Sequence, residues 1–445
     1  MTSHSHASGT RFLSDLPTGI VTRSAGFGID KIGMYVLLTL ICLVPFHQLV
    51  SAYFVYYKEA FAVLFIVLLF FRLTCRVRYL HRKVELTFLW LFPCLLLAFA
   101  VLDDGKLLYD DSAIEYSANV TGIPPALVIL RNATLYLPMV TYLTIRGLSR
   151  SEVRKVAYCC TFVAPLSIFL YIYSSPSLSV RNIGASGGDG TAYLNYVPYL
   201  TYASLCGFYL LISTVNPFIR IAVSTVVLII IYFAVLSTGR QNILFIAGTV
   251  ALFMVFAANL SYFRAVALVS LMAILTLGIG YVYLQNFEVS EKLVTRFSSL
   301  EGFFDLGEST TEAPEVTRYQ IMLNGLVVLT PQEYIWGAGL GSSNGPGPHN
   351  DYIKWIQRVG LMVATVGYLP FLMSIKRLFS QFKFRNTDSV QVFILLGLVF
   401  TMFYSVFGFP REDPYESPFV FLGLAMSLGY RCRPSRKRAE ATGGY

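Results

Sequence analysis

The chain has 445 residues, of which 55% are hydrophobic and 13% are charged, and its formal net charge is +9. Globular domains carry about 25% charged residues, so this composition excludes an ordinary soluble domain. Apolar runs as long as a membrane helix recur along the chain, which is typical of a polytopic helical membrane protein. The basic residues lie in short stretches between these runs, so the charge indicates membrane orientation rather than a nucleic-acid partner.

The apolar runs predict an all-α fold, a bundle of about twelve membrane helices, because one span needs about 20 residues. The expected spans are 34–51, 57–71, 86–102, 124–145, 156–173, 194–213, 219–237, 241–258, 265–284, 352–374, 389–408 and 417–430. The resulting organisation is a polar tail at 1–33, membrane helices at 34–284, a long loop at 285–351, membrane helices at 352–430 and a basic tail at 431–445.

Four basic stretches set the expected orientation. They are residues 72–85, 146–155, 375–388 and 431–445, and alternation of the spans places all four on one side. Positive charge is retained in the cytoplasm, so we expect both termini to be cytoplasmic and the loop 285–351 to lie outside. Within that loop, Thr317–Leu329 has apolar residues at near-helical spacing, which predicts an interfacial helix that Thr317 caps.

The most distinctive stretch runs from Tyr334 to Gly360, where glycines and prolines precede His349, Asn350 and Asp351. So many glycines and prolines predict irregular backbone at the mouth of the next membrane helix. His349 is the candidate general base, because an imidazole has a pKa naturally close to neutrality. The alternative is a structural hydrogen bond that holds the loop.

Arginines also gather on the outward side, where orientation alone does not favour them: Arg131, Arg181, Arg240 and Arg318. A guanidinium forms paired hydrogen bonds with phosphate, so the chemistry indicates a phosphate-bearing lipid head group. Structural alternatives are snorkelling for Arg240, a solvated helix face for Arg318 and an ion pair with an outer acidic residue for Arg131. We expect Arg296, in the same long loop, to be solvated. No spacing of ligands indicates a metal site, and no cofactor is expected.

Three segments resemble the O-antigen ligase/polymerase family of polytopic membrane glycosyltransferases. They are RNIGASGGDGTAYLN from Arg181, STGRQN around Arg240, and the long loop with RYQIMLNGLVVL, WGAGLG and HNDYIKWIQRVG. The GGDG that follows Ala185 departs from the asparagine-rich loops common in the family. The resemblance implies a metal-independent, inverting glycosyltransferase of the bacterial cytoplasmic (inner) membrane with a periplasmic active site.

The implied donor is a glycan on undecaprenyl diphosphate. Arg240 and Arg318 match arginines proposed to engage the diphosphate, and His349 matches the histidine proposed to activate the acceptor hydroxyl. Arg181 matches a less uniform position, and Arg131 is a further candidate for substrate binding.

Two acceptors are compatible with the resemblance. A lipid-linked repeat unit would make the protein an O-antigen or exopolysaccharide polymerase, which we favour, and lipid A core would make it an O-antigen ligase. A flippase for lipid-linked oligosaccharides is the alternative of a different class. Membrane lipid is an expected partner, and a chain-length regulator is a further candidate.

Overall fold

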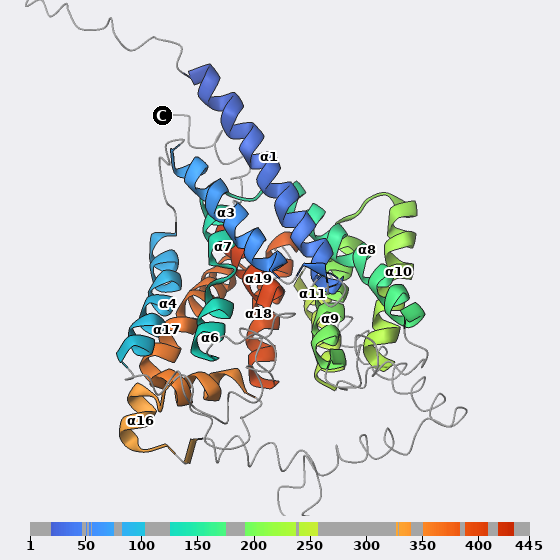
Figure 1. The fold of residues 1–445 in the computed structure, drawn as a ribbon. Coiled ribbons are helices and arrows are strands. Elements are labelled where there is room, and N and C mark those ends of the chain that lie inside the picture. Colours follow the sequence, from blue (N-terminus) through green and yellow to red (C-terminus); the bar gives the residue numbers. More distant parts are fainter. Residues whose placement is uncertain are drawn as a thin grey trace, which may run out of the picture.

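The computed structural model describes residues 19–46, 50, 53–54, 56–74, 82–102, 125–174, 192–236, 240–256, 326–327, 329–339, 350–382, 388–407 and 417–430. In this part of the chain all the regular secondary structure is helical. An isolated β-bridge joins Leu148 to Tyr430. The helices stand side by side, with α16 at the end away from the start of α1 (Figure 1).

The helices are α1 (Gly19–Leu43), η1 (Val44–Phe46), α3 (Tyr57–Thr74), α4 (Lys83–Leu102), α6 (Pro125–Thr134), α7 (Leu137–Arg146), α8 (Arg150–Ser174), α9 (Ala192–Ser213), α10 (Pro217–Leu236), α11 (Arg240–Phe256), α16 (Pro331–Trp336), α17 (Asp351–Gln381), α18 (Ser389–Phe407) and α19 (Ser417–Gly429). The bounds of α3, α4, α9, α10, α11, α18 and α19 agree with the expected spans to within three residues. The span expected at 265–284 and most of the helix expected at Thr317–Leu329 lie outside the described residues.

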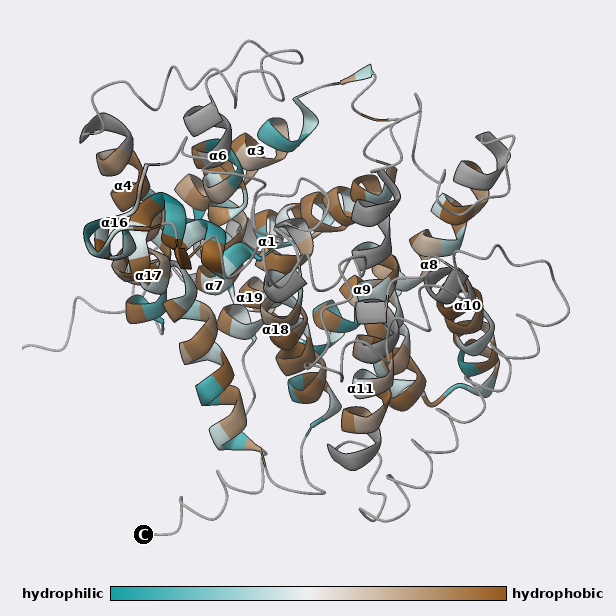
Figure 2. Ribbon diagram, turned by 90° about the horizontal axis from the view of Figure 1, so that it is seen from below, coloured by the Kyte–Doolittle hydropathy of each residue, from teal (hydrophilic) through white to brown (hydrophobic). Residues whose placement is uncertain are grey.

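Among the described residues, three helices are long and apolar enough to cross a membrane, namely Gly28–Phe46, Arg150–Leu170 and Asp351–Gln381, and several shorter apolar helices accompany them. Large apolar side chains also cover outward faces, for example Val63, Ile66 and Phe70 on α3 and Phe218, Ile221 and Leu228 on α10. Figure 2 shows apolar residues on both helices. These faces are what lipid contact requires.

Three expected spans before residue 180 were wrong in detail. The helix expected at 156–173 begins six residues earlier, at Arg150. The helix expected at 34–51 begins at Gly19 and ends at Leu43, where Pro45 lies in a short 3-10 turn. The single helix expected at 124–145 is two helices, α6 and α7, separated at residues 135–136. Pro138 explains this break, because it has no N–H to donate to the carbonyl of Thr134.

Aromatic packing joins α9, α18 and α19 in the larger of two apolar cores. The rings of Tyr209 and Phe393 stack with centroids 4.7 Å apart, and Tyr202 meets Phe400 edge-on at 5.2 Å. A Cβ on Gly423 would lie 2.9 Å from the carbonyl oxygen of Gly397, so α18 and α19 pack backbone against backbone. Such close contact between small residues is a common way for helices to associate in membranes.

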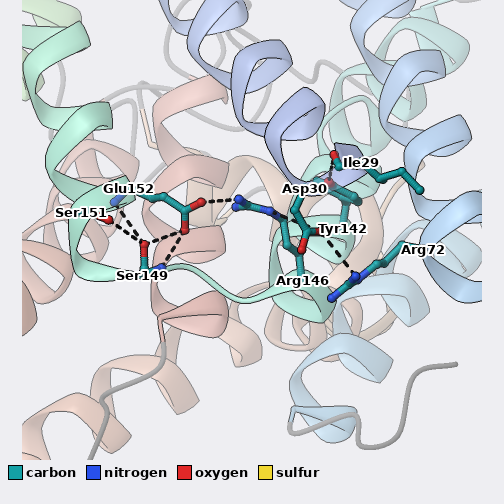
Figure 3. A network of polar contacts seen from close by, with 8 residues as sticks. All are labelled: Ile29, Asp30, Arg72, Tyr142, Arg146, Ser149, Ser151 and Glu152. Atoms are coloured by element: carbon teal, nitrogen blue, oxygen red, sulfur yellow. Dashed lines mark hydrogen bonds and ion pairs between the residues drawn. The ribbon is translucent and has the colours of Figure 1, made fainter. Parts of the chain in front are cut away.

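An ion network joins α1, α3, α7 and α8 at the end of the bundle where α1 begins (Figure 3). Asp30 lies 3.5 Å from Arg72 and 3.6 Å from Arg146, and Arg146 also pairs with Glu152. The backbone N–H of Ser149 donates to Glu152 at 2.9 Å. The network therefore ties one end each of α3, α7 and α8 to the middle of α1.

Four further polar contacts lie at the same end of the bundle, which is called the basic end below. Arg377 donates to Glu85 at 2.6 Å and to the carbonyl of Ser427 at 2.9 Å. Asp388 lies 3.4 Å from Arg150 and accepts the hydroxyl of Tyr430 at 3.2 Å. Arginines from four helices thus gather at this end of the bundle, namely Arg72 of α3, Arg146 of α7, Arg150 of α8 and Arg377 of α17.

Candidate functional site

The predicted site residues fall unevenly on the described chain. His349, Arg318 and Arg181 lie outside the described residues. Arg240 is the first residue of α11, so its backbone position is known. Among the predicted residues, Arg131 has a side chain that the structure describes. The geometry of the site is therefore built from the residues that flank the predicted ones.

The residue directly after His349 is a helix cap. Asn350 has extended backbone, with φ −152° and ψ 115°, and its side-chain oxygen accepts the backbone N–H of Ile353 at 3.1 Å. An asparagine in this position satisfies one of the free N–H groups at the start of a helix. Helix α17 thus begins at Asp351, two residues after His349 in the sequence.

The first turn of α17 is held from two directions. Asp351 is 0% exposed, and its carboxylate accepts the hydroxyl of Tyr368 at 2.6 Å. The ring of Tyr352 lies on that of Tyr368, with centroids 4.4 Å apart, and its hydroxyl donates to the carbonyl of Met402 at 3.1 Å. These contacts link the turn to the later part of α17 and to α18.

Helix α17 is broken at Gly360, where φ is 76° and ψ is 166°. The span expected at 352–374 is thus a helix that starts one residue earlier and ends at Gln381, and the break at Gly360 was not expected. The first segment lies steeply across the second at the end of the bundle that holds α16 (Figure 1). Helix geometry cannot continue through a residue with this φ, and glycine adopts it without a steric cost. The second segment, 361–381, is still long enough to span a bilayer.

The segment that follows α16 covers the break. Ala338 donates its N–H to the carbonyl of Gln357 at 2.6 Å, and Gly339 donates to the carbonyl of Arg358 at 3.2 Å. These carbonyls lie at the end of the first segment of α17, where a helix leaves carbonyls without intrahelical partners. Part of the glycine-rich stretch that the sequence singled out thus caps the broken helix.

The start of α11 and the start of α17 both contact one turn of α18. Phe245, five residues after Arg240, packs its ring against Phe400 and Phe403, with centroids 5.2 and 5.7 Å apart. Tyr352 reaches Met402 in the same turn of α18. The opposite end of α18 adjoins Asp388 at the basic end. Each of the two helices therefore contacts the same turn of α18 near its own start, toward the end of α18 that is opposite to Asp388.

Arg131 pairs with Glu59 in the first turn of α3. The flanking residues Leu130 and Ala133 belong to the apolar cluster around Trp355 of α17, so α6 borders the same region. The pair matches the structural alternative for Arg131, which makes this residue the weaker candidate for substrate contact.

Sequence reasoning missed three features of this region. The sequence marks Asp351 only as part of a polar stretch and gives no sign of Tyr368, because their contact crosses a helix break. The short helix α16 was also unexpected, although Thr330, Pro331 and Glu333 form a visible start signal of the T-P-x-E type.

The described part of this region combines a buried carboxylate, a tyrosine hydroxyl that donates to it, and the start of α17. No protein-family model matches the chain, and no curated protein matches it either.

Proposed function

We propose that this chain is a membrane protein of about twelve spanning helices that transfers an undecaprenyl-diphosphate-linked glycan to a sugar hydroxyl at the periplasmic face. The basic end then faces the cytoplasm together with both termini, and the opposite end faces the periplasm. The observation that supports this proposal best is that α11 and α17 both contact one turn of α18 near their starts. Arg240 is the first residue of α11, and His349 lies two residues before the start of α17 in the sequence.

In this mechanism His349 takes the proton from the acceptor hydroxyl as its oxygen attacks the anomeric carbon of the donor. The bond from that carbon to the lipid diphosphate breaks, and the configuration at the carbon inverts. Arg240 and Arg318 hold the negative charge that develops on the leaving diphosphate. A diphosphate leaves readily once its charge is held, so this chemistry needs no metal in principle.

The identity of the acceptor decides between a polymerase and a ligase. A growing chain moved onto a new lipid-linked repeat unit gives a polymerase, the function that we favour. Purified protein in liposomes, supplied with lipid-linked donor and either acceptor, separates the two possibilities. A ladder of lengthened lipid-linked glycan supports a polymerase, and glycan on lipid A core supports a ligase.

The same assay tests the arginines. Arg240→Ala and Arg318→Ala are expected to weaken donor binding about 10- to 100-fold, the usual cost of a lost hydrogen bond to a charged group. Arg296→Ala is the matched control, since it removes an arginine of the same loop that we expect to be solvated. Transport of donor across the bilayer without transfer to either acceptor would instead support a flippase.

A further inference from the structure

The contact between Asp351 and Tyr368 calls for an explanation, because a buried carboxylate is costly unless its charge is compensated. Asp351 is 0% exposed and occupies the first position of α17. Two features there favour the charged form, namely the positive end of the helix dipole and the hydroxyl of Tyr368 at 2.6 Å. A hydrophobic residue would fill the same space and would need no partner for a charge. The carboxylate therefore also holds the position of Tyr368 through its hydrogen bond.

The two residues face each other across the break in α17. Asp351 lies nine residues before Gly360, and Tyr368 lies eight residues after it. Their hydrogen bond therefore closes the angle between the two segments. Tyr352 adds a ring contact to Tyr368 and a hydrogen bond to α18. The first turn of α17 is fixed at both sides of the break.

We propose that Asp351 and Tyr368 are positioning residues for the general base. The inference rests on the proposed function, in which His349 takes the acceptor proton. Only two peptide units separate His349 from Asp351, so their Cα atoms can be at most about 7 Å apart in any conformation. Whatever fixes the capped first turn also limits where the imidazole is held. Neither positioning residue needs to touch the substrate.

Tyr368→Phe tests the hydrogen bond, because it keeps the ring and removes only the hydroxyl. We expect kcat for glycan transfer to fall about tenfold while the donor KM and the donor Kd stay unchanged, since one hydrogen bond to a charged group is lost. Asp351→Asn keeps an oxygen that can accept from Tyr368, so its loss of kcat should be smaller than that of Asp351→Ala.

The double variant Asp351→Ala with Tyr368→Phe should lose no more kcat than Asp351→Ala alone, because both changes remove the same interaction. Tyr404→Phe is the matched control. Its buried hydroxyl donates to Thr201 at 3.2 Å, in the core between α9 and α18. It should lower the unfolding temperature about as much as Tyr368→Phe but leave kcat at the wild-type value.

Three results would overturn the inference. The first is that Tyr368→Phe keeps the wild-type kcat while the separate variant His349→Ala abolishes transfer. The second is equal loss of kcat in Tyr368→Phe and Tyr404→Phe, which would reflect stability alone. The third is wild-type transfer by His349→Ala, which removes the proposed function itself and the inference with it.

Discussion

The backbone carbonyl of Ile335 lies directly against Gly360, where a Cβ would overlap it and would come within 2.6 Å of the nitrogen of Trp336. Gly337 is equally confined, since a Cβ there would lie 2.6 Å from the Cα of Val359. Both glycines also have positive φ. The end of α16 and the break in α17 therefore meet backbone to backbone.

Gly360→Ala is expected to destabilise the protein by more than about 1 kcal/mol, because it adds both a steric overlap and an unfavourable φ. Gly248→Ala is the control, since a Cβ at this helical position meets nothing within 4 Å. It should be neutral or stabilise by up to about 1 kcal/mol. Thermal unfolding in detergent measures both, and equal unfolding temperatures for the two variants would contradict the close contact.

The ion network at the basic end predicts unequal roles for two arginines. The side chain of Arg146 is 6% exposed and pairs with Asp30 and Glu152, so Arg146→Ala leaves two carboxylates without their shared cation. Breaking a fully buried pair costs about 3–5 kcal/mol, and the cost here should be smaller because both carboxylates are partly exposed and Asp30 keeps its contact with Arg72. The side chain of Arg150 is 55% exposed, and its contact with Asp388 should contribute at most about 1 kcal/mol. Equal loss of stability in Arg146→Ala and Arg150→Ala would count against the network.

The pair of Arg131 and Glu59 is predicted to be structural. Both side chains are partly exposed, so Arg131→Ala and Glu59→Ala should each cost about 1 kcal/mol or less, and the double variant should cost no more than either. Donor KM should stay unchanged in all three variants. A raised donor KM in Arg131→Ala alone would instead place this arginine at the diphosphate.

The stability of helix α16 should depend on pH through the carboxyl group of Glu333. Thr330 donates its backbone N–H and its hydroxyl to the Glu333 carboxylate, each at 2.8 Å, and these bonds hold the pKa of Glu333 below its usual value of 4.5. The stabilisation is thus fully present above pH 4.5 and is lost as the pH falls through the lower folded-state pKa. Amide hydrogen exchange in residues 333–336, corrected for intrinsic rates, should speed up on acidification, and Glu333→Gln should remove that pH dependence. Identical pH profiles for both proteins would refute this role of Glu333.

Most helix positions could be predicted from the sequence, because a membrane span needs a long apolar run and the chain contains such runs. The division between α6 and α7 was also readable, since Pro138 stood inside the expected span. The break at Gly360 was not, because a glycine within an apolar run is often tolerated in a membrane helix. Only the carbonyl of Ile335, brought there by the fold, makes that glycine necessary.

For the same reason, candidate site residues can be proposed from the sequence. His349 and Arg240 stand out as polar groups beside apolar runs, whereas the contact of Asp351 with Tyr368 depends on the angle of a broken helix. The contacts of α11 and α17 with α18 depend on aromatic side chains such as Phe245. No local sequence pattern indicates which residues these side chains pack against.

The central claim is that His349 acts as the base in glycan transfer from a polyprenyl diphosphate. The most direct measurement is a single-turnover assay of purified wild-type protein and His349→Ala in liposomes, with donor binding measured in parallel. The account predicts unchanged donor Kd and a transfer rate at least about 100-fold lower in His349→Ala, the usual contribution of a general base. Transfer at the wild-type rate by His349→Ala would contradict it.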